Sequence, residues 1–445
     1  MNITAEPPSS TFDLSKLTPL GNEVRERLQQ RIEALADISE STDGLMRRFA
    51  TPEHRRANTL AAEWMRDAGM RVWEDAMGNL IGRYPADDTT SPAILIGSHL
   101  DTVIMAGRFD GMLGVLSGIA VVESLQQEQR QLPVAIEVVA FADEEGVRYQ
   151  STYLGSKAIT GSFDMTDLER VDKDGISMAE ALRQFGQDPS QLPAASRSSN
   201  DFLAYLEVHI EQGPVLETEN EPVGIVTGIA GATRMRVTLH GVAGHAGTVP
   251  MRLRHDAMSA AAAGIVAIEG LCVEAENLVG TVGELSVSPG ASNVIAGEVS
   301  FSIDLRSPQD ARRLNAVAAV TAAIREAASE RGVEATIETV HDENSVDCSS
   351  VLADLAATAI ESCAGRPLRI ASGAGHDAAE MAKLTPTGML FVRCLGGVSH
   401  NPAEYVTPED MLAGVEALRR WTLLAAHTDI PFDHNESADS KKARP

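Results

Sequence analysis

Two apolar runs of strand length stand out in the first third of the chain, and each of them ends in polar residues. The first begins at Ile94 and ends in Gly-Ser-His99, and the second, Val134 to Ala142, ends in Asp143-Glu144-Glu145. Residues 111–125 lie between them and space small and large apolar side chains as a buried helix does. The order strand, helix, strand predicts a parallel sheet, in which both polar strand ends lie at the edge where α/β sheets bind ligands.

The pattern changes after residue 214. Alternating apolar and polar positions predict strands within 224–241, 279–287, 298–305 and 334–340, and helices are predicted at 257–268 and 311–332. This β-α-β-β-α-β order is typical of a ferredoxin-like antiparallel sheet with two helices on one face. The earlier pattern then resumes, with a helix predicted at 352–364, a buried strand at 388–395 and a helix at 408–427.

The sequence therefore predicts an α/β fold: a catalytic domain with a mixed, mainly parallel sheet, and an inserted ferredoxin-like α+β domain. The expected bounds are 16–213 and 346–427 for the two parts of the first domain, 214–345 for the insertion, and 428–445 for a disordered tail.

Length limits the number of domains that the chain can form, and charge limits the kinds of binding partner. A chain of 445 residues is long enough for two domains with separate cores. Its formal net charge of -26 argues against nucleic acid and against anionic membrane surfaces, both of which need a basic footprint. The four cysteines are scattered singly, as in proteins of a reducing compartment, and neither a signal peptide nor a membrane-spanning run is recognised. The expected location is the cytoplasm.

Imidazoles and carboxylates gather at the predicted sheet edge. His99, Asp110 and Glu145 surround the first two strands, and His209 and His400 lie in two further polar motifs. A single histidine at a strand end is usually an ordinary hydrogen-bonded residue, so the conjunction matters more than any member. Together these five residues predict a two-metal site for ions such as Zn²⁺ or Mn²⁺, with one carboxylate shared.

Further residues suit the chemistry of such a site. With Glu145 as a ligand, Glu144 is free to act as general acid and base, and Asp101 is placed to hold the second ring nitrogen of His99. His245, in a turn rich in Gly and Ala, could steady an oxyanion. Arg306 could hold a substrate carboxylate, although an arginine at a strand end is more often part of a surface ion pair.

These motifs carry a family resemblance over about residues 55–423. His99-x-Asp101, Gly-Arg-Phe-Asp110-Gly, Asp-Glu144-Glu145-Gly, His209-Ile-Glu-Gln212-Gly, Gly-His245-Ala-Gly, Gly-Ala-Gly-His376-Asp-Ala and Ser-His400-Asn-Pro-Ala-Glu404 resemble the hydantoinase/carbamoylase branch of the M20 metallopeptidases. His209 distinguishes this branch from ordinary M20 peptidases, which typically place a carboxylate there. The branch contains allantoate amidohydrolases, N-carbamoyl-L-amino acid hydrolases and β-ureidopropionases.

The resemblance implies two divalent ions per subunit (Zn²⁺, Mn²⁺ or Co²⁺), bridged by Asp110, with Glu144 as the base. It also implies a homodimer formed by the inserted domains, in which His245 reaches the partner's active site and the inserted domain swings to close the site. The positions matching substrate contacts in the family are Gln212, Arg234, His245, Asn293, Arg306 and Gly375. Relatives differ in sequence near Arg234, so the resemblance supports a substrate contact less strongly at Arg234 than at the other five positions.

The expected substrate is a small ureido acid. Several motifs look most similar to allantoate amidohydrolases, which favours conversion of allantoate to ureidoglycine, ammonia and carbon dioxide, with N-carbamoyl-L-amino acids as the alternative. A β-ureidopropionase, or a dipeptidase or aminoacylase on the same scaffold, is a weaker alternative. A non-catalytic binding protein that keeps the fold is weaker still, because the ligand set is intact.

Overall fold

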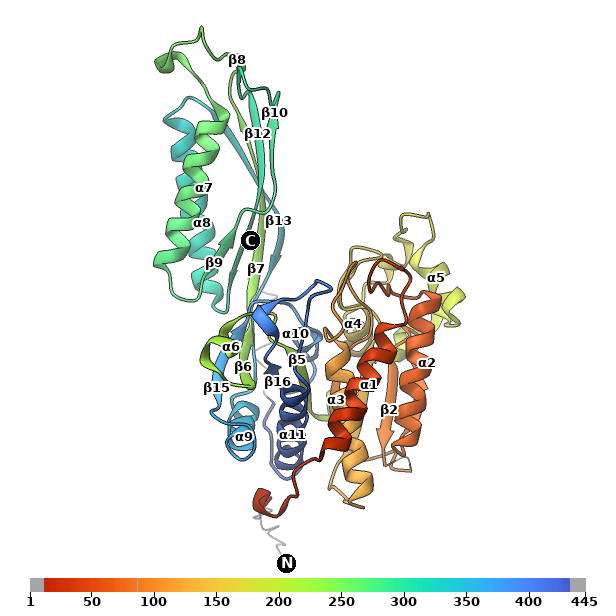
Figure 1. The fold of residues 1–445 in the computed structure, drawn as a ribbon. Coiled ribbons are helices and arrows are strands. Elements are labelled where there is room, and N and C mark those ends of the chain that lie inside the picture. The colour runs from red at the N-terminus through yellow and green to blue at the C-terminus, as the bar shows by residue number, and fades with distance from the viewer. Residues whose placement is uncertain (1–11, 86, 433–445) are drawn as a thin grey trace, which may run out of the picture. The chain divides into compact units, whose positions relative to one another are not determined.

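The chain divides into two compact units. The computed structural model describes residues 12–85 and 87–432 (Figure 1). The first unit takes its described residues from 1–227, 348–370 and 376–445, and the second consists of 228–347 and 371–375. The first unit therefore extends beyond the predicted boundary at residue 214. Of the predicted tail, residues 433–445 lie outside the described part of the chain.

A mixed sheet forms the centre of the first unit. Its strands are β1 (Arg71–Glu74), β2 (Leu80–Tyr84), β3 (Ala93–His99), β4 (Ala135–Phe141), β5 (Phe202–Ile210), β6 (Val223–Ile229), β15 (Leu368–Ser372) and β16 (Thr387–Val392). The short β14 (Val346–Asp347) pairs with Gly228 and Ile229 at the end of β6, and these residues count with the second unit. The spatial order is β1-β2-β4-β3-β5-β16-β6-β14, and β15 also pairs with β6. The four central strands, β4, β3, β5 and β16, are mutually parallel, and the pairs outside them for which a register is defined are antiparallel. The prediction of a mainly parallel sheet therefore holds for the central strands.

Helices pack against this sheet, whose strands β3 and β4 are buried along their whole length. The helices of the first unit are α1 (Asn22–Ala36), α2 (Pro52–Asp67), α3 (Met112–Gln127), α4 (Leu154–Thr160), α5 (Met178–Phe185), α6 (Val215–Glu219), α9 (Ser350–Glu361), α10 (Asp377–Met381) and α11 (Pro408–Ala425). Residues 112–125 of α3 are all buried, because α3 packs on β3 and β5 and is covered by α1 and α11. The helix predicted at 111–125 is confirmed.

Local sequence signals set two of the helix starts. Thr51 caps α2 by accepting a hydrogen bond from the backbone N–H of His54, and Pro52 follows at the first helical position. Thr407 caps α11 in the same way, and Pro408 follows as the first residue of that helix. Proline suits this position because it fixes φ where its missing N–H is not needed.

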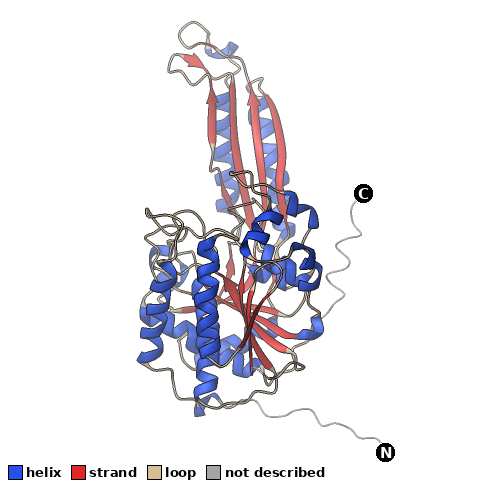
Figure 2. Cartoon of the chain, turned by 90° about the vertical axis from the view of Figure 1, so that its right-hand side faces the viewer, coloured by secondary structure: helices blue, strands red, loops and turns tan. Residues whose placement is uncertain are grey.

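The second unit is an antiparallel sheet with two long helices. Its strands are β7 (Gly231–His240), β8 (Gly244–His245), β9 (Val279–Thr281), β10 (Leu285–Ser288), β11 (Val294–Ile295), β12 (Glu298–Ser307) and β13 (Glu334–Glu343). The main sheet has the order β10-β12-β7-β13. Helices α7 (Ala257–Glu274) and α8 (Asp310–Ser329) cover one face (Figures 1 and 2). The order of strands and helices along the chain is the predicted one.

Two segments differ from the sequence-based expectation. The strand predicted from residue 224 onward is split: β6 pairs antiparallel with β16, and β7 alone lies in the sheet of the second unit. Helices α4 and α5 were not predicted, and they pack with Phe49, Met77 and Tyr149 in a smaller core. The remaining elements are 3-10 helices at Leu14–Lys16, Met165–Glu169, Pro189–Ala195, Ser199–Asp201, Met251–Leu253 and Leu395–Gly397.

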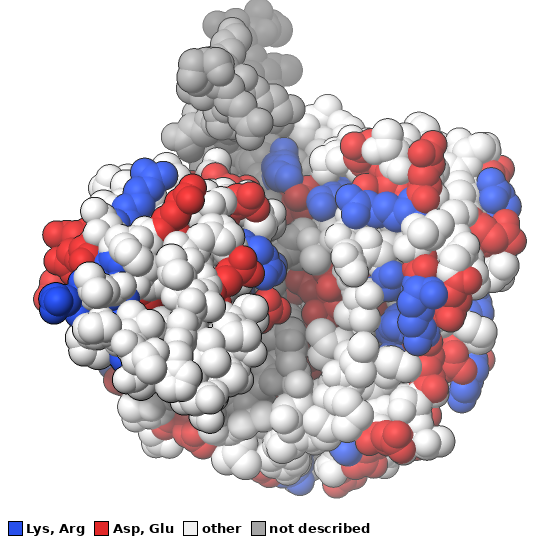
Figure 3. All heavy atoms as spheres, turned by 90° about the horizontal axis from the view of Figure 1, so that it is seen from above, with Lys and Arg blue, Asp and Glu red and all other residues white. Residues whose placement is uncertain are grey.

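The surface mixes both signs of charge. On the face seen in Figure 3, acidic and basic side chains lie close to one another in scattered groups, between wider uncharged areas. Among the described residues, α7 is the one helix long and apolar enough to span a membrane by length and composition. In the structure α7 packs along α8 over the sheet, and residues such as Ala261 and Ile268 form part of the core there.

Candidate metal centre

Three parallel strands bring histidines and carboxylates to one edge of the sheet. His99 is the last residue of β3 and is in register with Phe141, the last residue of the neighbouring β4. The chain then continues after β4 into Glu144 and Glu145. His209 lies next to the end of β5, which runs parallel to β3. These side chains are close together because the strands point the same way.

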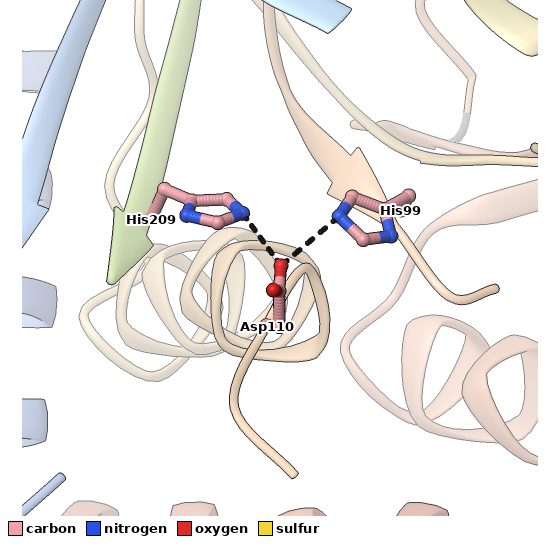
Figure 4. A group of neighbouring side chains, drawn as sticks. All are labelled: His99, Asp110 and His209. Atoms are coloured by element: carbon pink, nitrogen blue, oxygen red, sulfur yellow. Dashed lines mark ion pairs between the residues drawn. The ribbon is translucent and has the colours of Figure 1, made fainter. Parts of the chain in front are cut away.

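Asp110 lies between the two buried histidines (Figure 4). Its Oδ1 is 3.0 Å from Nε2 of His209 and 3.4 Å from Nε2 of His99. Its Oδ2 is 3.3 Å from Nε2 of His400. The two oxygens of one carboxylate therefore face different histidines, which is the arrangement that a carboxylate bridging two cations requires.

Two of the groups of neighbouring donor atoms share Asp110, and a third consists of His99, Glu144 and Glu145. One group is His99, Asp110 and His209, and another is Asp110, Glu145 and His400, with 3.6 Å between Oε1 of Glu145 and Nε2 of His400. The first group is buried, whereas the His400 side chain is 49% exposed. All five predicted ligands are thus brought together, in one enclosed and one more open group.

The outer ring nitrogens are held by backbone carbonyls. Nδ1 of His99 lies 3.0 Å from the carbonyl oxygen of Asp101, and Nδ1 of His209 lies 2.9 Å from that of Ile210. A proton on each Nδ1 leaves each Nε2 as a lone-pair donor, the form in which imidazole binds a metal.

Asp101 has a second task besides its contact with His99. Its carboxylate lies 3.5 Å from Nδ1 of His99, whose hydrogen bond goes to the backbone carbonyl of Asp101. The same carboxylate accepts hydrogen bonds from the backbone N–H groups of Glu144 and Glu145 at 3.0 and 3.1 Å. Asp101 therefore ties the end of β3 to the glutamate turn that follows β4.

The electrostatics of the centre indicate a shortage of positive charge. Burial, together with repulsion from Asp110, raises the pKa of Glu145 to about 7. Burial also raises the pKa of Glu144 well above its usual range, with His99 opposing and Glu145 adding to the shift. Burial lowers the pKa of His99, but hydrogen bonds to Asp101 and Asp110 outweigh it and raise the pKa well above its usual range. Such a set of buried donors fits divalent cations, which would relieve the repulsion among the carboxylates.

Gly111 makes the close approach of His99 and Asp110 possible. Its φ is +70°, and a Cβ built on it would lie 2.5 Å from the imidazole of His99. Only glycine accommodates both the positive φ and the nearby imidazole at the start of α3.

Three further residues surround Asp110. Gln212, predicted as a substrate contact, donates from Nε2 to Oδ2 of Asp110 at 3.0 Å and to Oγ of Ser399 at 3.1 Å. Ser399 also contacts Oδ2 of Asp110, and buried Glu404 accepts from the backbone N–H of Asp110. No contact role was predicted for Ser399 or Glu404, although both lie in the Ser-His400-Asn-Pro-Ala-Glu404 motif, which was the available signal.

A second group of buried side chains was also missed. Glu207, His209 and His376 form another cluster close enough to share an ion. His376 packs against His209 with 4.5 Å between ring centroids, and Asp377 accepts a hydrogen bond from Ser156 at 2.5 Å. The alternation of β5 places Glu207 on the same side as His209, and this spacing could have identified it.

The substrate contacts predicted in the second unit form two groups. His245 on β8 is in register with Val294 on β11, and the backbone N–H of Ala246 donates to the carbonyl of Asn293 at 3.0 Å. The short β8-β11 ladder therefore places His245 and Asn293 side by side, and the His245 side chain is exposed.

Arg234 and Arg306 share one carboxylate on the sheet face. Asp304 accepts from Nε of Arg234 at 3.0 Å and from Nε and Nη2 of Arg306 at 2.8 and 2.9 Å. Nη1 of Arg306 donates to the carbonyl of Gly373 at 2.8 Å, in the 371–375 segment that also contains Gly375. A cavity of about 680 Å³ is lined by Arg234, Asp304, Arg306 and Gly373. Arg306 thus forms an ion pair and also lines the cavity.

Comparison with known proteins agrees with this geometry. Residues 95–423 match the model of peptidase family M20/M25/M40. The chain is 44% identical to the N-carbamoyl-L-amino acid amidohydrolase of Geobacillus stearothermophilus, over 88% of this chain and 96% of the relative. It is 42% identical to the allantoate deiminase of Arabidopsis thaliana, over 87% of this chain and 80% of the relative.

A solved structure is similar over nearly its whole length. The amidase of the hydantoinase/carbamoylase family from Burkholderia multivorans superposes with a TM-score of 0.86 at 33% identity, over 91% of this chain and 98% of that one. The chain therefore belongs to the peptidase M20/M25/M40 family, within its hydantoinase/carbamoylase branch.

Proposed function

We propose that this protein is a metal-dependent amidohydrolase that cleaves the carbamoyl C–N bond of a small ureido acid. The observation that carries the proposal is the position of Asp110, whose two oxygens face His209 and His400 while Glu144 lies beside His99 in a neighbouring donor group. This arrangement has a bridge for two cations and a carboxylate left over for proton transfer.

Each chain would hold two divalent ions, chosen from Zn²⁺, Mn²⁺ and Co²⁺. His99 and His209 would bind one ion and Glu145 and His400 the other, with Asp110 shared. When bound, such ions would polarise a carbonyl and lower the pKa of an attacking water. The mixture of imidazole and carboxylate donors suits these ions better than Mg²⁺ or Ca²⁺, which prefer oxygen ligands alone.

Glu144 would move the proton. It accepts a proton from the attacking water as the water oxygen bonds to the ureido carbonyl carbon, and it returns the proton to the leaving nitrogen as the C–N bond breaks. Asp101 keeps Glu144 in place through the backbone of the glutamate turn.

The predicted substrate contacts would bind the two ends of the ureido acid. We propose that Arg306 binds the carboxylate, with Arg234 and the backbone at Gly375 beside it, and that Asn293 also contacts the substrate. His245 would stabilise the oxyanion in the active site of the partner subunit. Gln212 would keep the bridging carboxylate oriented and contact the ureido group through Oε1, which is buried and has no hydrogen-bond partner among the residues that the structure describes.

Two substrates are favoured. Allantoate is the preferred one, because motifs of this chain resemble allantoate amidohydrolases and three relatives named allantoate deiminase are 41–42% identical. An N-carbamoyl-L-amino acid is the second, and the relative at 44% identity that carries that name supports it. Allantoate would yield ureidoglycine, ammonia and carbon dioxide.

We further propose that the second unit forms a homodimer and acts as a lid, and that the enzyme works in the cytoplasm. Exposed apolar side chains at helical spacing support the dimer: Met258, Val266 and Val273 line one side of α7 with exposures of 37%, 66% and 80%. An apolar stripe of this kind is typical of a surface that a partner covers.

An ammonia-release assay tests the proposal. Protein loaded in turn with Mn²⁺, Zn²⁺ and Co²⁺ is incubated with allantoate and with N-carbamoyl-L-methionine, and the relative rates rank the two substrates. No ammonia from either substrate with any of the three ions would falsify the activity. Efficient cleavage of dipeptides without action on ureido acids would instead establish a peptidase.

A further inference from the structure

Asp110 is held by its own set of hydrogen bonds, separate from the contacts to the histidines. Its Oδ2 accepts from Nε2 of Gln212 at 3.0 Å and from Oγ of Ser399 at 3.1 Å. Oδ1, by contrast, faces His99 and His209. The restraint therefore acts on one oxygen of the bridge, the oxygen that faces His400.

Glu404 stabilises the backbone at Asp110. Its side chain is buried, and its Oε1 accepts from the backbone N–H groups of Phe109 and Asp110 at 2.8 and 3.1 Å. Its Oε2 lies 3.1 Å from Oγ of Ser399. Gly107 makes room for this carboxylate, since a Cβ there would lie 2.1 Å from Cδ of Glu404. Glu404 thus holds the backbone of Asp110 and also lies against Ser399, which contacts the side chain of Asp110.

Ser399 has a single proton for two acceptors. Because Gln212 donates to Oγ of Ser399, the serine hydroxyl must direct its own proton to Asp110 or to Glu404. Ser399 therefore donates to one of the two carboxylates at a time, whereas the Gln212 amide donates to Oδ2 of Asp110 in both cases. The orientation of the Asp110 carboxylate is thus restrained by contacts that are independent of any ion.

We propose that Ser399 and Glu404 are positioning residues that set the affinity of the more open cation site, the one formed by Asp110, Glu145 and His400. Among the described residues, Glu404 belongs to none of the groups of His, Cys, Asp and Glu that could hold an ion. Ser399 and Glu404 act through Oδ2 of Asp110, so their loss should weaken the ion beside His400 and leave the ion between His99 and His209 nearly unchanged. The inference rests on the proposed binuclear centre, but it does not depend on which substrate is cleaved.

The test is a metal titration of the full-length protein after removal of bound metal. Mn²⁺ is added to wild type and to Ser399→Ala, and both binding steps are followed by calorimetry, with metal content measured after dialysis. We expect one step to weaken about 10- to 100-fold, as is usual when an outer-shell partner of a metal ligand is removed, and the other to change less than about threefold. Ser399→Thr, which keeps the hydroxyl, should restore most of the lost affinity.

A matched control separates positioning from general loss of structure. Ser162 donates to Glu380 at 2.9 Å, a serine-to-glutamate bond of the same kind outside the metal-binding groups. Ser162→Ala should leave both binding steps unchanged, and the metal-free forms of Ser399→Ala and wild type should melt at similar temperatures. Glu404→Gln, whose amide oxygen can still accept from the backbone of Asp110, should weaken the same step less than Ser399→Ala does.

Three results would overturn the inference: equal weakening of both steps in Ser399→Ala, no weakening of either, or a wild type that binds one ion only. The titration needs no substrate, so an inactive protein that showed the selective loss would contradict the proposed function and still support the positioning role. Activity of Ser399→Ala should recover at high Mn²⁺ concentration, which a misfolded variant would not do.

Discussion

Oδ1 of Asp110 lies 3.0 Å from Nε2 of His209, although the two residues come from different parts of the chain. Asp110 precedes α3, and His209 lies near the end of β5. The contact arises because α3 packs against β5, so that the start of the helix faces the strand end. The fold therefore builds the bridge of the proposed metal pair from one helix start and the ends of parallel strands.

The proton-transfer role of Glu144 predicts a variant that separates metal binding from turnover. Glu144→Gln should bind metal as the wild type does and lose about 10²- to 10⁴-fold in kcat, because the amide cannot accept the proton. Metal analysis and ammonia release are measured on the same sample. Parallel loss of metal and activity would instead identify Glu144 as a ligand.

The close contact at Gly111 predicts a loss of metal binding from a single added methyl group. Gly111→Ala should lose about 1–2 kcal/mol of stability from its positive φ and should also displace His99. Gly175→Ala is the matched control, since its φ is +79° but no atom lies within 4 Å of the added Cβ. Urea unfolding should show a loss of stability in both variants, larger in Gly111→Ala because of the clash with His99, and metal affinity should fall only in Gly111→Ala. A normal metal affinity in Gly111→Ala would refute the steric argument.

The proposed carboxylate contact predicts a change in KM. Arg306→Lys keeps the charge but loses the two-pronged geometry, and the loss of a charge-assisted hydrogen bond should raise KM about 10- to 100-fold with a smaller effect on kcat. Arg369→Lys, a change at an exposed ion pair with Asp354 in the first unit, should behave like wild type. An unchanged KM in Arg306→Lys would remove this residue from the binding site.

Buried His54 predicts a dependence of stability on pH. Burial lowers its pKa to about 3, and its Nδ1 accepts a hydrogen bond from the backbone N–H of Ala50. Between pH 6.5 and about 3 the unfolded chain therefore binds one more proton at His54 than the folded chain does, and stability falls as the pH falls. This residue should contribute about 1.4 kcal/mol of loss per pH unit in that window.

His54→Gln removes the titrating group and keeps a hydrogen-bond acceptor. The difference in unfolding free energy between pH 7 and pH 5, measured in urea with metal absent, should be smaller in the variant than in wild type. The same pH dependence in both proteins would show that His54 does not control it.

Much of this architecture is readable from the sequence, and the exceptions have physical reasons. Apolar runs that end in His99 and Glu144 predict strand ends at one edge, because strands buried on both faces carry few polar residues before they stop. The boundary near residue 214 was misplaced because β6 alternates like the strand after it, whereas its partner β16 comes much later in the chain. Pairing between distant segments leaves no local signal.

The contacts around Asp110 show the same limit. The five candidate ligands are histidines and carboxylates, whose chemistry marks them out in the sequence. Ser399 and Glu404 are common surface residue types, and only the folded chain shows that one contacts Oδ2 of Asp110 and the other its backbone.

The central claim is that two cations share Asp110. Crystals grown with Mn²⁺ and measured by anomalous diffraction test this most directly. We expect two anomalous peaks, one beside His99 and His209 and the other beside Glu145 and His400, with Asp110 between them. A single peak, or peaks away from Asp110, would contradict the account.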